Sequence, residues 1–237
     1  MALTSLNLAD ILFLDIETVP EQEHFDNLDH ESQILWEAKT QYKRKDEFTA
    51  KEYYDRAGIW AEFGKIVCIS VGFFNPKKEK EFRVTSFSGE ETKILKYFKT
   101  LIHNHFNQPQ HLFCAHNGKE FDFPYIARRM LINGIALPKK LDLFGKKPWE
   151  IPYLDTLELW KFGDYKHYTS LRLLTHILKV PSPKDDIDGS QVYEVYYQDG
   201  DIDRICRYCE KDVVALAQVF LRLRQEDLLT PDQILSV

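Results

Sequence analysis

Two acidic residues interrupt a strongly apolar stretch near the start of this 237-residue chain. Residues 11–18 read ILFLDIET and predict a buried strand, yet Asp15 and Glu17 lie inside it. Side chains two residues apart in a strand point to the same face, so the two carboxylates should project together. Buried neighbouring carboxylates repel each other, and Mg²⁺ or Mn²⁺, which prefer oxygen ligands, would compensate them. Taken alone, this common pattern favours the alternative of a strand end where both side chains reach water.

Two further carboxylates stand where a metal cluster would need them. Asp122 follows an apolar strand-like run and opens a helix, a place where an aspartate also serves as an ordinary N-cap. Asp212 interrupts an apolar helical stripe made of Ile205, Cys209, Leu216, Val219 and Leu223. A carboxylate there is costly unless it pairs with a buried Arg or Lys or binds a metal. Tyr208 lies one helical turn earlier on nearly the same face. Three such sites together favour a metal cluster.

The cysteines and histidines predict no second metal site. Cys206 and Cys209 form a Cys-x-x-Cys inside a helix, without the further pair of ligands that zinc needs, so core packing is expected. Cys68 and Cys114 fall in strand-like apolar runs, and reduced thiols are expected throughout. The His103–His105 run lies at a polar helix end and should be solvated. Residues 189–192 (GSQV) predict a helix cap, with substrate contact as the alternative.

The elements around these groups alternate between strands and helices. Strands are predicted at 11–18, 65–74, 81–87 and 111–117, with a turn at 75–80 and a strand or helix start at 153–160. A helix running to about His105 is predicted behind a capping box formed by Ser88 to Glu91, and further helices are predicted over 122–135, 170–179, 190–198 and 202–225. The charged segment 21–62 contains two helical stretches, 33–48 and 49–63, and is interpreted as an insertion. This order predicts one domain over residues 1–237 with an α/β fold, a mixed sheet flanked by helices.

Composition is that of a globular protein. Charged residues are 29% and hydrophobic residues 44% of the chain, and neither a signal peptide nor a membrane span is predicted, so a cytoplasmic protein without membrane association is expected. The net charge of −6 argues against a large nonspecific nucleic-acid surface. It is compatible with a nuclease that neutralises phosphates through metal ions and a local basic patch.

Three motifs occur in the order expected for a known nuclease superfamily. D-x-E in FLDIET, N-G-x-x-F-D in NGKEFD and Y-x-x-x-D in YCEKD resemble the exonuclease motifs of the DEDD superfamily. Arg207 stands where the sister subclass has His, so the chain resembles the tyrosine subclass. More closely, it is similar to predicted 3′-5′ exonucleases related to the proofreading domain of family-B DNA polymerases. GIWAEFGKIVCISVG and DGSQVYEVY also resemble that group, and the resemblance covers roughly residues 11–224.

The resemblance implies a ribonuclease H-like fold and a two-metal mechanism. Asp15, Glu17, Asp122 and Asp212 would hold two divalent ions, Mg²⁺ or Mn²⁺, with Asp15 bridging both. Glu17 and Asp212 would complete the first site, and Asp122 would help to hold the second. Tyr208 would orient the attacking water. The expected activity is hydrolysis at the 3′ end of single-stranded nucleic acid, DNA favoured over RNA, which releases 5′-mononucleotides.

Other residues carry weaker expectations. Asn117, in the second motif, is expected to contact substrate. Basic residues after that motif offer phosphate contacts, with a solvated surface as the alternative; they are Arg128, Arg129, Lys139, Lys140, Lys146 and Lys147. Trp36, Tyr54 and Trp60 are expected in a core, with base stacking as the alternative.

Two other functions stay open. One is a catalytically silent nucleic-acid-binding module on the same fold, against which the intact carboxylate set and Tyr208 count. The other is a metal-dependent phosphoesterase acting on nucleotides, with which the acidic net charge is compatible. With no polymerase domain in the sequence, the enzyme is expected to act alone or through a protein partner.

Overall fold

The computed structural model describes residues 3–45, 47–78, 80–164, 167–181 and 187–237. Six strands form one sheet in the order β5-β4-β1-β2-β3-β6. The strands are β1 (Ile11–Pro20), β2 (Gly64–Phe74), β3 (Phe82–Ser88), β4 (Leu112–Ala115), β5 (Leu154–Asp155) and β6 (Ile234–Ser236). The helices are α1 (His30–Arg44), α2 (Glu91–His105), α3 (Asp122–Ile132), α4 (Thr156–Lys161), α5 (Leu171–Ile177), α6 (Val192–Glu194) and α7 (Ile202–Leu223). Among the helices in these ranges, none has the length and apolarity to cross a membrane.

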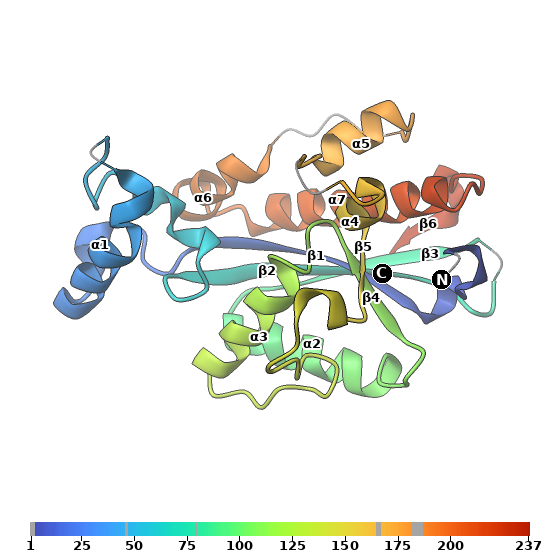
Figure 1. The fold of residues 1–237 in the computed structure, drawn as a ribbon, viewed down its shortest axis with the longest axis horizontal. Coiled ribbons are helices and arrows are strands. Elements are labelled where there is room, and N and C mark those ends of the chain that lie inside the picture. The colour runs from blue at the N-terminus through green and yellow to red at the C-terminus, as the bar shows by residue number, and fades with distance from the viewer. Residues whose placement is uncertain (1–2, 46, 79, 165–166, 182–186) are drawn as a thin grey trace.

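The alternating side chains of β1 build two hydrophobic layers. Leu12 and Leu14 pack in the core that α2 and α3 cover, whereas Ile11 and Phe13 pack against α7 on the other face. Figure 1 shows α7 on one side of the sheet and α2 and α3 on the other. With a period of two residues, Asp15 and Glu17 continue the set of Ile11 and Phe13. The two carboxylates therefore face α7.

The sheet is mixed, as the sequence predicted. β2 pairs antiparallel with β1 and with β3, while β4 runs parallel to β1, and β5 runs parallel to β4. β6 adds a parallel edge strand beside β3 that the sequence analysis did not predict. The predicted α/β architecture of a mixed sheet flanked by helices is confirmed.

The predicted capping box at the start of α2 is wrong. Ser88 is the last residue of β3, and the N-cap position of α2 is Glu90. The Glu91 carboxylate instead accepts hydrogen bonds from the Arg129 guanidinium at 2.6 and 2.8 Å and from the main-chain N–H of Ile66 at 2.8 Å. A charge-assisted bidentate pair is stronger than a neutral capping bond, so the tertiary partner of Glu91 determines its position.

The segment 21–62 is only partly helical. Its first stretch forms α1, which lies beyond the ends of β1 and β2 (Figure 1), but residues 49–63 form turns and a 3-10 turn, Tyr54–Ile59. A β-carbon on Gly58 would lie 3.1 Å from the Val19 Cα, so the chain must turn closely against β1 here. Trp36 and Tyr54 are buried, and Trp60 packs against them, which confirms the expected core role. Two predicted positions, Asp46 in the first stretch and Glu79 in the turn after β2, lie outside the described residues.

The remaining helices agree with the sequence apart from their ends. α3 ends before Gly134, which adopts the left-handed backbone (φ 64°) that favours glycine after a helix. Residues 153–160 contain both predicted possibilities, the short β5 followed at once by α4. The predicted helix over 190–198 is the short α6 followed by a π-helical turn, Val195–Asp199. The N-cap residue there is Asp188, whose carboxylate accepts the main-chain N–H of Ser190 at 2.9 Å.

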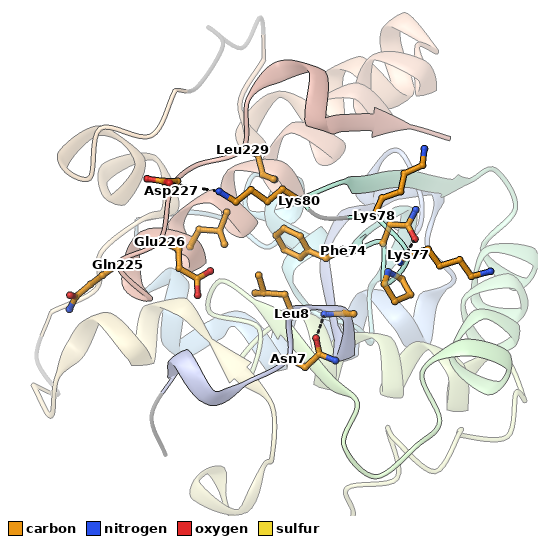
Figure 2. A pocket seen from close by; sticks show the side chains of 14 residues that line it. Asn7, Leu8, Phe74, Lys77, Lys78, Lys80, Gln225, Glu226, Asp227 and Leu229 are labelled. Atoms are coloured by element: carbon orange, nitrogen blue, oxygen red, sulfur yellow. Dashed lines mark hydrogen bonds and ion pairs between the residues drawn. The ribbon is translucent and has the colours of Figure 1, made fainter.

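A cavity of about 690 Å³ lies at the end of the sheet where β2 turns into β3. Figure 2 shows Lys77, Lys78 and Lys80 around it, together with Gln225, Glu226 and Asp227, which follow α7. Two of these lysines are paired, Lys80 with Asp227 at 3.7 Å and Lys78 with Glu81 at 3.0 Å. Nine residues of α7, or about 14 Å, separate Asp212 from Leu221 at the cavity wall. This cavity is therefore distinct from the acidic side chains of β1.

Candidate active site

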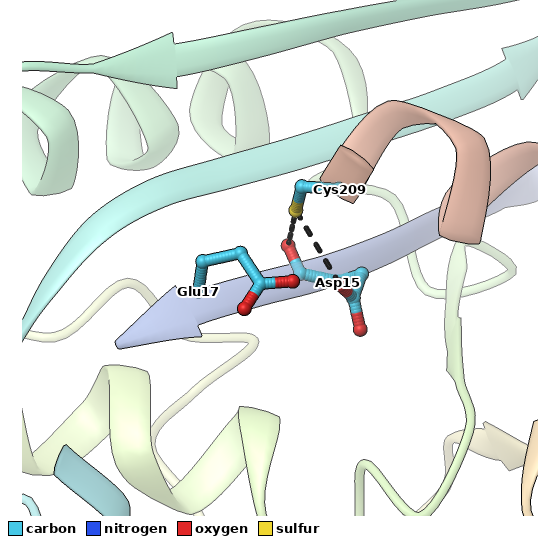
Figure 3. Close-up of side chains that lie close together, drawn as sticks. All are labelled: Asp15, Glu17 and Cys209. Carbon is cyan, nitrogen blue, oxygen red and sulfur yellow. Dashed lines mark hydrogen bonds between the residues drawn. The ribbon is translucent and has the colours of Figure 1, made fainter. Parts of the chain in front are cut away.

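The acidic pair of β1 lies beneath α7. One ligand atom each of Asp15, Glu17 and Cys209 lies within 4.8 Å of the others (Figure 3). Glu17 is buried and Asp15 half-buried. The register of β1 against β2 shifts between Glu17 and Thr18, a bulge that changes the local twist directly after the pair. The structure thus places the two predicted carboxylates on one face, as the residue spacing indicated.

α7 supplies the second group of side chains. Asp201 caps the helix by accepting the Arg204 N–H at 2.9 Å. The Cys209 sulfur lies 3.4 Å from both the main-chain oxygen and Oδ2 of Asp15. One turn apart on the helix, the Tyr208 hydroxyl lies close enough to the Asp212 carboxylate for the charge of Asp212 to raise the pKa of Tyr208. α7 therefore brings a thiol, a phenol and a carboxylate to the face of β1 that bears Asp15.

Asp122 reaches the same place from the opposite layer. It is the first residue of α3, with Phe121 rather than Asp122 at the N-cap position, and it is 3% exposed. β4 pairs with β1 only over Ile11–Phe13, so the edge of β1 beyond Phe13 is open to other groups. The Asp122 carboxylate lies close enough to Asp15 to raise the pKa of that residue by repulsion. Among the described side chains, its Oδ1 is a buried oxygen without a hydrogen-bond partner.

The electrostatics of the cluster disfavour ionisation. Burial, followed by repulsion from Asp122 and Asp212, raises the pKa of Asp15 well above its usual value. Burial and then repulsion from Asp15 raise the pKa of Glu17 in the same way, and burial raises the pKa of Asp122 to about 7. A cation among these groups would relieve both the desolvation and the repulsion. The oxygen-rich donor set and the unpartnered Asp122 oxygen therefore fit a hard divalent ion.

A buried carboxylate that the sequence analysis missed holds the turn before Asp122. Asp155 is 3% exposed and accepts the main-chain N–H groups of Asn117, Lys119 and Leu157 at 2.9, 3.1 and 3.0 Å. Gly118, within this turn, has no room for a side chain, because a β-carbon would lie 2.3 Å from the Ala115 Cβ. The signal was present in the sequence: Asp155 stands between a short strand and the start of a helix, a pattern similar to the one that singled out Asp122.

The turn also contains Asn117, predicted to contact substrate. Its backbone is left-handed (φ 62°), and its main-chain N–H is bound to Asp155. The preceding His116 lies between the Thr156 hydroxyl and the Thr169 main-chain oxygen, each 2.9 Å away. Burial lowers the pKa of His116, so it stays neutral at pH 7. These contacts give the turn a fixed shape beside the carboxylates.

The predicted basic cluster separates into two kinds of residue. Arg129 is 3% exposed and forms its bidentate pair with Glu91, and its Nη1 donates to the Ala61 main-chain oxygen at 2.9 Å. A phosphate-contacting role for Arg129 is therefore wrong. The Lys140 ammonium donates to the His111 main-chain oxygen. The exposed members are Arg128, Lys139, Lys146 and Lys147.

The Cys-x-x-Cys pair packs in the core, as expected, but next to the candidate site. All four cysteines are free. Cys206 contacts Cys68 of β2 at 3.7 Å between sulfurs, and Cys209 contacts Asp15. The helical stripe that includes Cys209 could have indicated this placement, because Asp212 lies on the same face three residues later.

Comparisons with known proteins assign the fold and the family. A family model described as "Predicted 3'-5' exonuclease related to the exonuclease domain of PolB" matches residues 59–233, which include Asp122, Tyr208 and Asp212 but begin after Asp15 and Glu17. Among solved structures, the family B DNA polymerase from the hyperthermophilic archaeon Pyrobaculum calidifontis is similar, with 15% identity and a TM-score of 0.54. The match covers 89% of this chain and 24% of that polymerase chain. Curated proteins give no match to the sequence.

These matches agree with the geometry. The structural likeness, at 15% identity, concerns the fold, and the mixed sheet flanked by helices is the ribonuclease H-like fold of a polymerase exonuclease domain. The family model covers about three quarters of the sequence. The chain therefore belongs to the family of predicted 3′-5′ exonucleases related to the exonuclease domain of PolB.

Proposed function

We propose that this protein is a metal-dependent 3′-5′ exonuclease of the DEDD superfamily, tyrosine subclass. It hydrolyses the terminal phosphodiester at the 3′ end of single-stranded nucleic acid, with DNA favoured, and releases 5′-mononucleotides. One observation carries the proposal. Carboxylates from the central strand β1 and from α3 and α7 lie close enough together to repel one another, and the buried Asp122 Oδ1 lacks a hydrogen-bond partner among the described residues.

Four carboxylates would hold two divalent ions, Mg²⁺ or Mn²⁺. Bound ions of this kind stabilise the charge on the attacking and leaving oxygens of an in-line displacement. Asp15 is central to the set, because repulsion from both Asp122 and Asp212 acts on it. We assign Glu17 and Asp212 to one ion, Asp122 to the other, and Asp15 to both. Their fixed positions on a central strand and two helices would orient the scissile phosphate without rearrangement.

Tyr208 would position the attacking water. Burial, followed by repulsion from Asp212, raises the pKa of Tyr208 above its usual value, so its hydroxyl stays protonated at pH 7 and can act through hydrogen bonds. It is thus an orienting group rather than a general base. A β-carbon at Gly189 would lie 4.0 Å from the Tyr208 oxygen, so the turn Gly189–Gln191 lies beside this hydroxyl without crowding it. Asn117, on the rigid turn before Asp122, would contact the terminal nucleotide.

A nuclease assay tests this proposal. Purified protein is incubated with single-stranded DNA and RNA oligonucleotides labelled at the 5′ end, in Mn²⁺ or Mg²⁺ and in EDTA. We expect a ladder that shortens from the 3′ end, is abolished by EDTA, and falls at least a thousandfold in Asp15→Ala. Far-ultraviolet circular dichroism checks that this variant keeps its fold. A folded Asp15→Ala protein with wild-type activity would overturn the site assignment, and turnover of free nucleotides instead of oligonucleotides would overturn the substrate class.

A further inference from the structure

The segment between α3 and β5 exposes two large aromatic side chains. Phe144 is 73% exposed and Trp149 is 76% exposed, and the residues between them read Gly-Lys-Lys-Pro. Exposed aromatics at this level gain nothing from core packing, and Trp and Phe are the residues that proteins use to stack bases or anchor partners. Figure 1 shows this segment passing along the outer side of α3 before it returns to the sheet at β5.

A groove of about 360 Å³ separates this segment from α3. Its lining is largely apolar and includes Leu131 from α3 and Leu137, Leu143 and Phe144 from the segment. The volume falls in the range of pockets that hold small ligands or parts of larger ones. A flat nucleobase therefore has both space and an apolar surface here.

The rim of the groove is basic in a chain whose net charge is −6. Residues 139–150 contain four lysines against two acids, Asp142 and Glu150. The Glu150 carboxylate accepts the main-chain N–H of Lys147 at 2.8 Å and keeps its charge, so the segment carries a net charge of about +2. Arg128 and Lys146 line the groove and are exposed, and the Lys147 ammonium lies 5.3 Å from the Trp149 ring centre. This charge complements a polyanion.

The groove begins next to the candidate active site. Lys119 is one of its lining residues, and it lies three positions before Asp122 in the turn that Asp155 holds. The Lys119 ammonium is paired with Glu158 at 2.7 Å, and the next exposed positive charge on α3 belongs to Arg128. From Asp122 to Arg128 and Leu131 the helix advances about 9 to 14 Å. Three to four nucleotides at about 3.4 Å each would span that length.

We propose that this groove, together with Lys147 and Trp149 of the same segment, binds the single strand upstream of its 3′ end, with bases on Phe144 and Trp149 and phosphates on Arg128, Lys146 and Lys147. The inference rests on the proposed function and adds a substrate-binding surface to it. Aromatic platforms combined with a basic track are the usual means of holding single strands without sequence preference. The exonuclease would therefore act better on oligonucleotides of at least four or five residues than on dinucleotides.

The test compares Phe144→Ala/Trp149→Ala with Tyr97→Ala, a control that removes an aromatic ring 58% exposed on α2. Fluorescence anisotropy in EDTA measures binding of a labelled 12-nucleotide single strand, so the readout does not depend on turnover. We expect the double variant to bind at least tenfold more weakly and the control to bind like the wild type. A double variant with wild-type affinity for the strand would overturn the proposal.

Two further experiments distinguish loss of binding in the groove from misfolding of the variant and from failure of the proposed nuclease activity. Lys146→Gln/Lys147→Gln should reduce the slope of log affinity against log salt by about two, because each lost phosphate contact removes about one. In Mn²⁺, kcat/KM of the aromatic variant should fall at least tenfold more for the 12-mer than for a dinucleotide. Equal losses on both substrates would indicate structural damage and overturn the proposal. If the wild type binds the strand through the groove yet cleaves neither substrate, the proposed activity fails while the groove stands.

Discussion

Replacing a carboxylate of the proposed metal site should stabilise the metal-free protein. Asp122 is buried at the start of α3, and burial raises the pKa of its carboxyl from 3.8 to about 7. The folded state therefore holds this proton more tightly than the unfolded state. The associated stability is fully present below pH 3.8 and is lost as the pH rises through about 7. Asp122→Asn removes the charge and keeps the shape.

The magnitude follows from the pKa. Each pKa unit corresponds to about 1.4 kcal/mol, so the ionised Asp122 carboxylate costs the metal-free protein about 4 kcal/mol at pH 8. Asp122→Asn removes this cost but buries an amide without hydrogen-bond partners, and an unsatisfied buried polar group itself costs about 1–3 kcal/mol. We therefore expect the variant to be about 1–3 kcal/mol more stable than the wild type at pH 8. Between pH 8 and pH 5 the free energy of unfolding of the variant should fall by about 2–3 kcal/mol relative to that of the wild type, because the wild-type carboxyl is protonated at pH 5.

Urea unfolding in EDTA at pH 5 and pH 8 measures this difference, with Mn²⁺ added in a parallel series. The comparison of variant with wild type cancels the titration of groups elsewhere in the chain. Mn²⁺ should stabilise the wild type more than the variant, because the variant lacks one proposed ligand, and hydrolysis should be lost. A variant less stable than the wild type by the same amount at both pH values would refute the argument that a buried charge opposes folding here.

Three other perturbations test the elements around the site. Asp155→Ala leaves three main-chain N–H groups without their acceptor, which should cost about 3 kcal/mol or more in urea unfolding and lower the nuclease rate. Arg129→Ala leaves Glu91 unpaired in a buried pair and should cost about 3–5 kcal/mol, whereas binding of a single strand by the folded fraction should be unchanged. Trp36→Ala empties the aromatic cluster of the segment 21–62 and should cost about 3–5 kcal/mol there. Hydrogen exchange should show lost protection in α1 while β1 and β2 stay protected, and uniform loss would contradict an insertion with its own core.

The sequence predicts the part of the site that depends on local periodicity. The two-residue period of β1 places Asp15 and Glu17 on one face, and the helical stripe of α7 places Asp212 among apolar residues. Both patterns hold because the two elements are central and buried, so their side-chain directions are fixed by the core. The expectation that Asp122 opens a helix holds for a similar reason, since Phe123 and Ile126 bury one face of α3.

The remaining features depend on partners that lie far away in the sequence. Glu91 does not form the predicted capping box because its carboxylate forms a bidentate pair with Arg129, 38 residues later in the sequence. Residues 49–63 turn instead of forming a helix because they wrap around Trp36 and pass close to Val19. β6 has only three residues, too few to show a period, and it exists because β3 offers an unpaired edge. None of these contacts can be predicted from a sequence window of about ten residues, because the two partners lie further apart than that in the chain.

The position of the acidic cluster in the molecule explains how it tolerates its own repulsion. Phe13, two residues before Asp15, makes edge-to-face contacts with Phe74, Phe82 and Phe220, with ring centres 5.6 to 5.9 Å apart. Leu14, on the opposite face, lies in the second core. β1 is thus held from both sides, and the carboxylates cannot separate without breaking two hydrophobic layers. The free energy of packing therefore holds the carboxylates together although their repulsion opposes folding. The proposed cation site is thus preorganised, and its shape does not depend on bound ions.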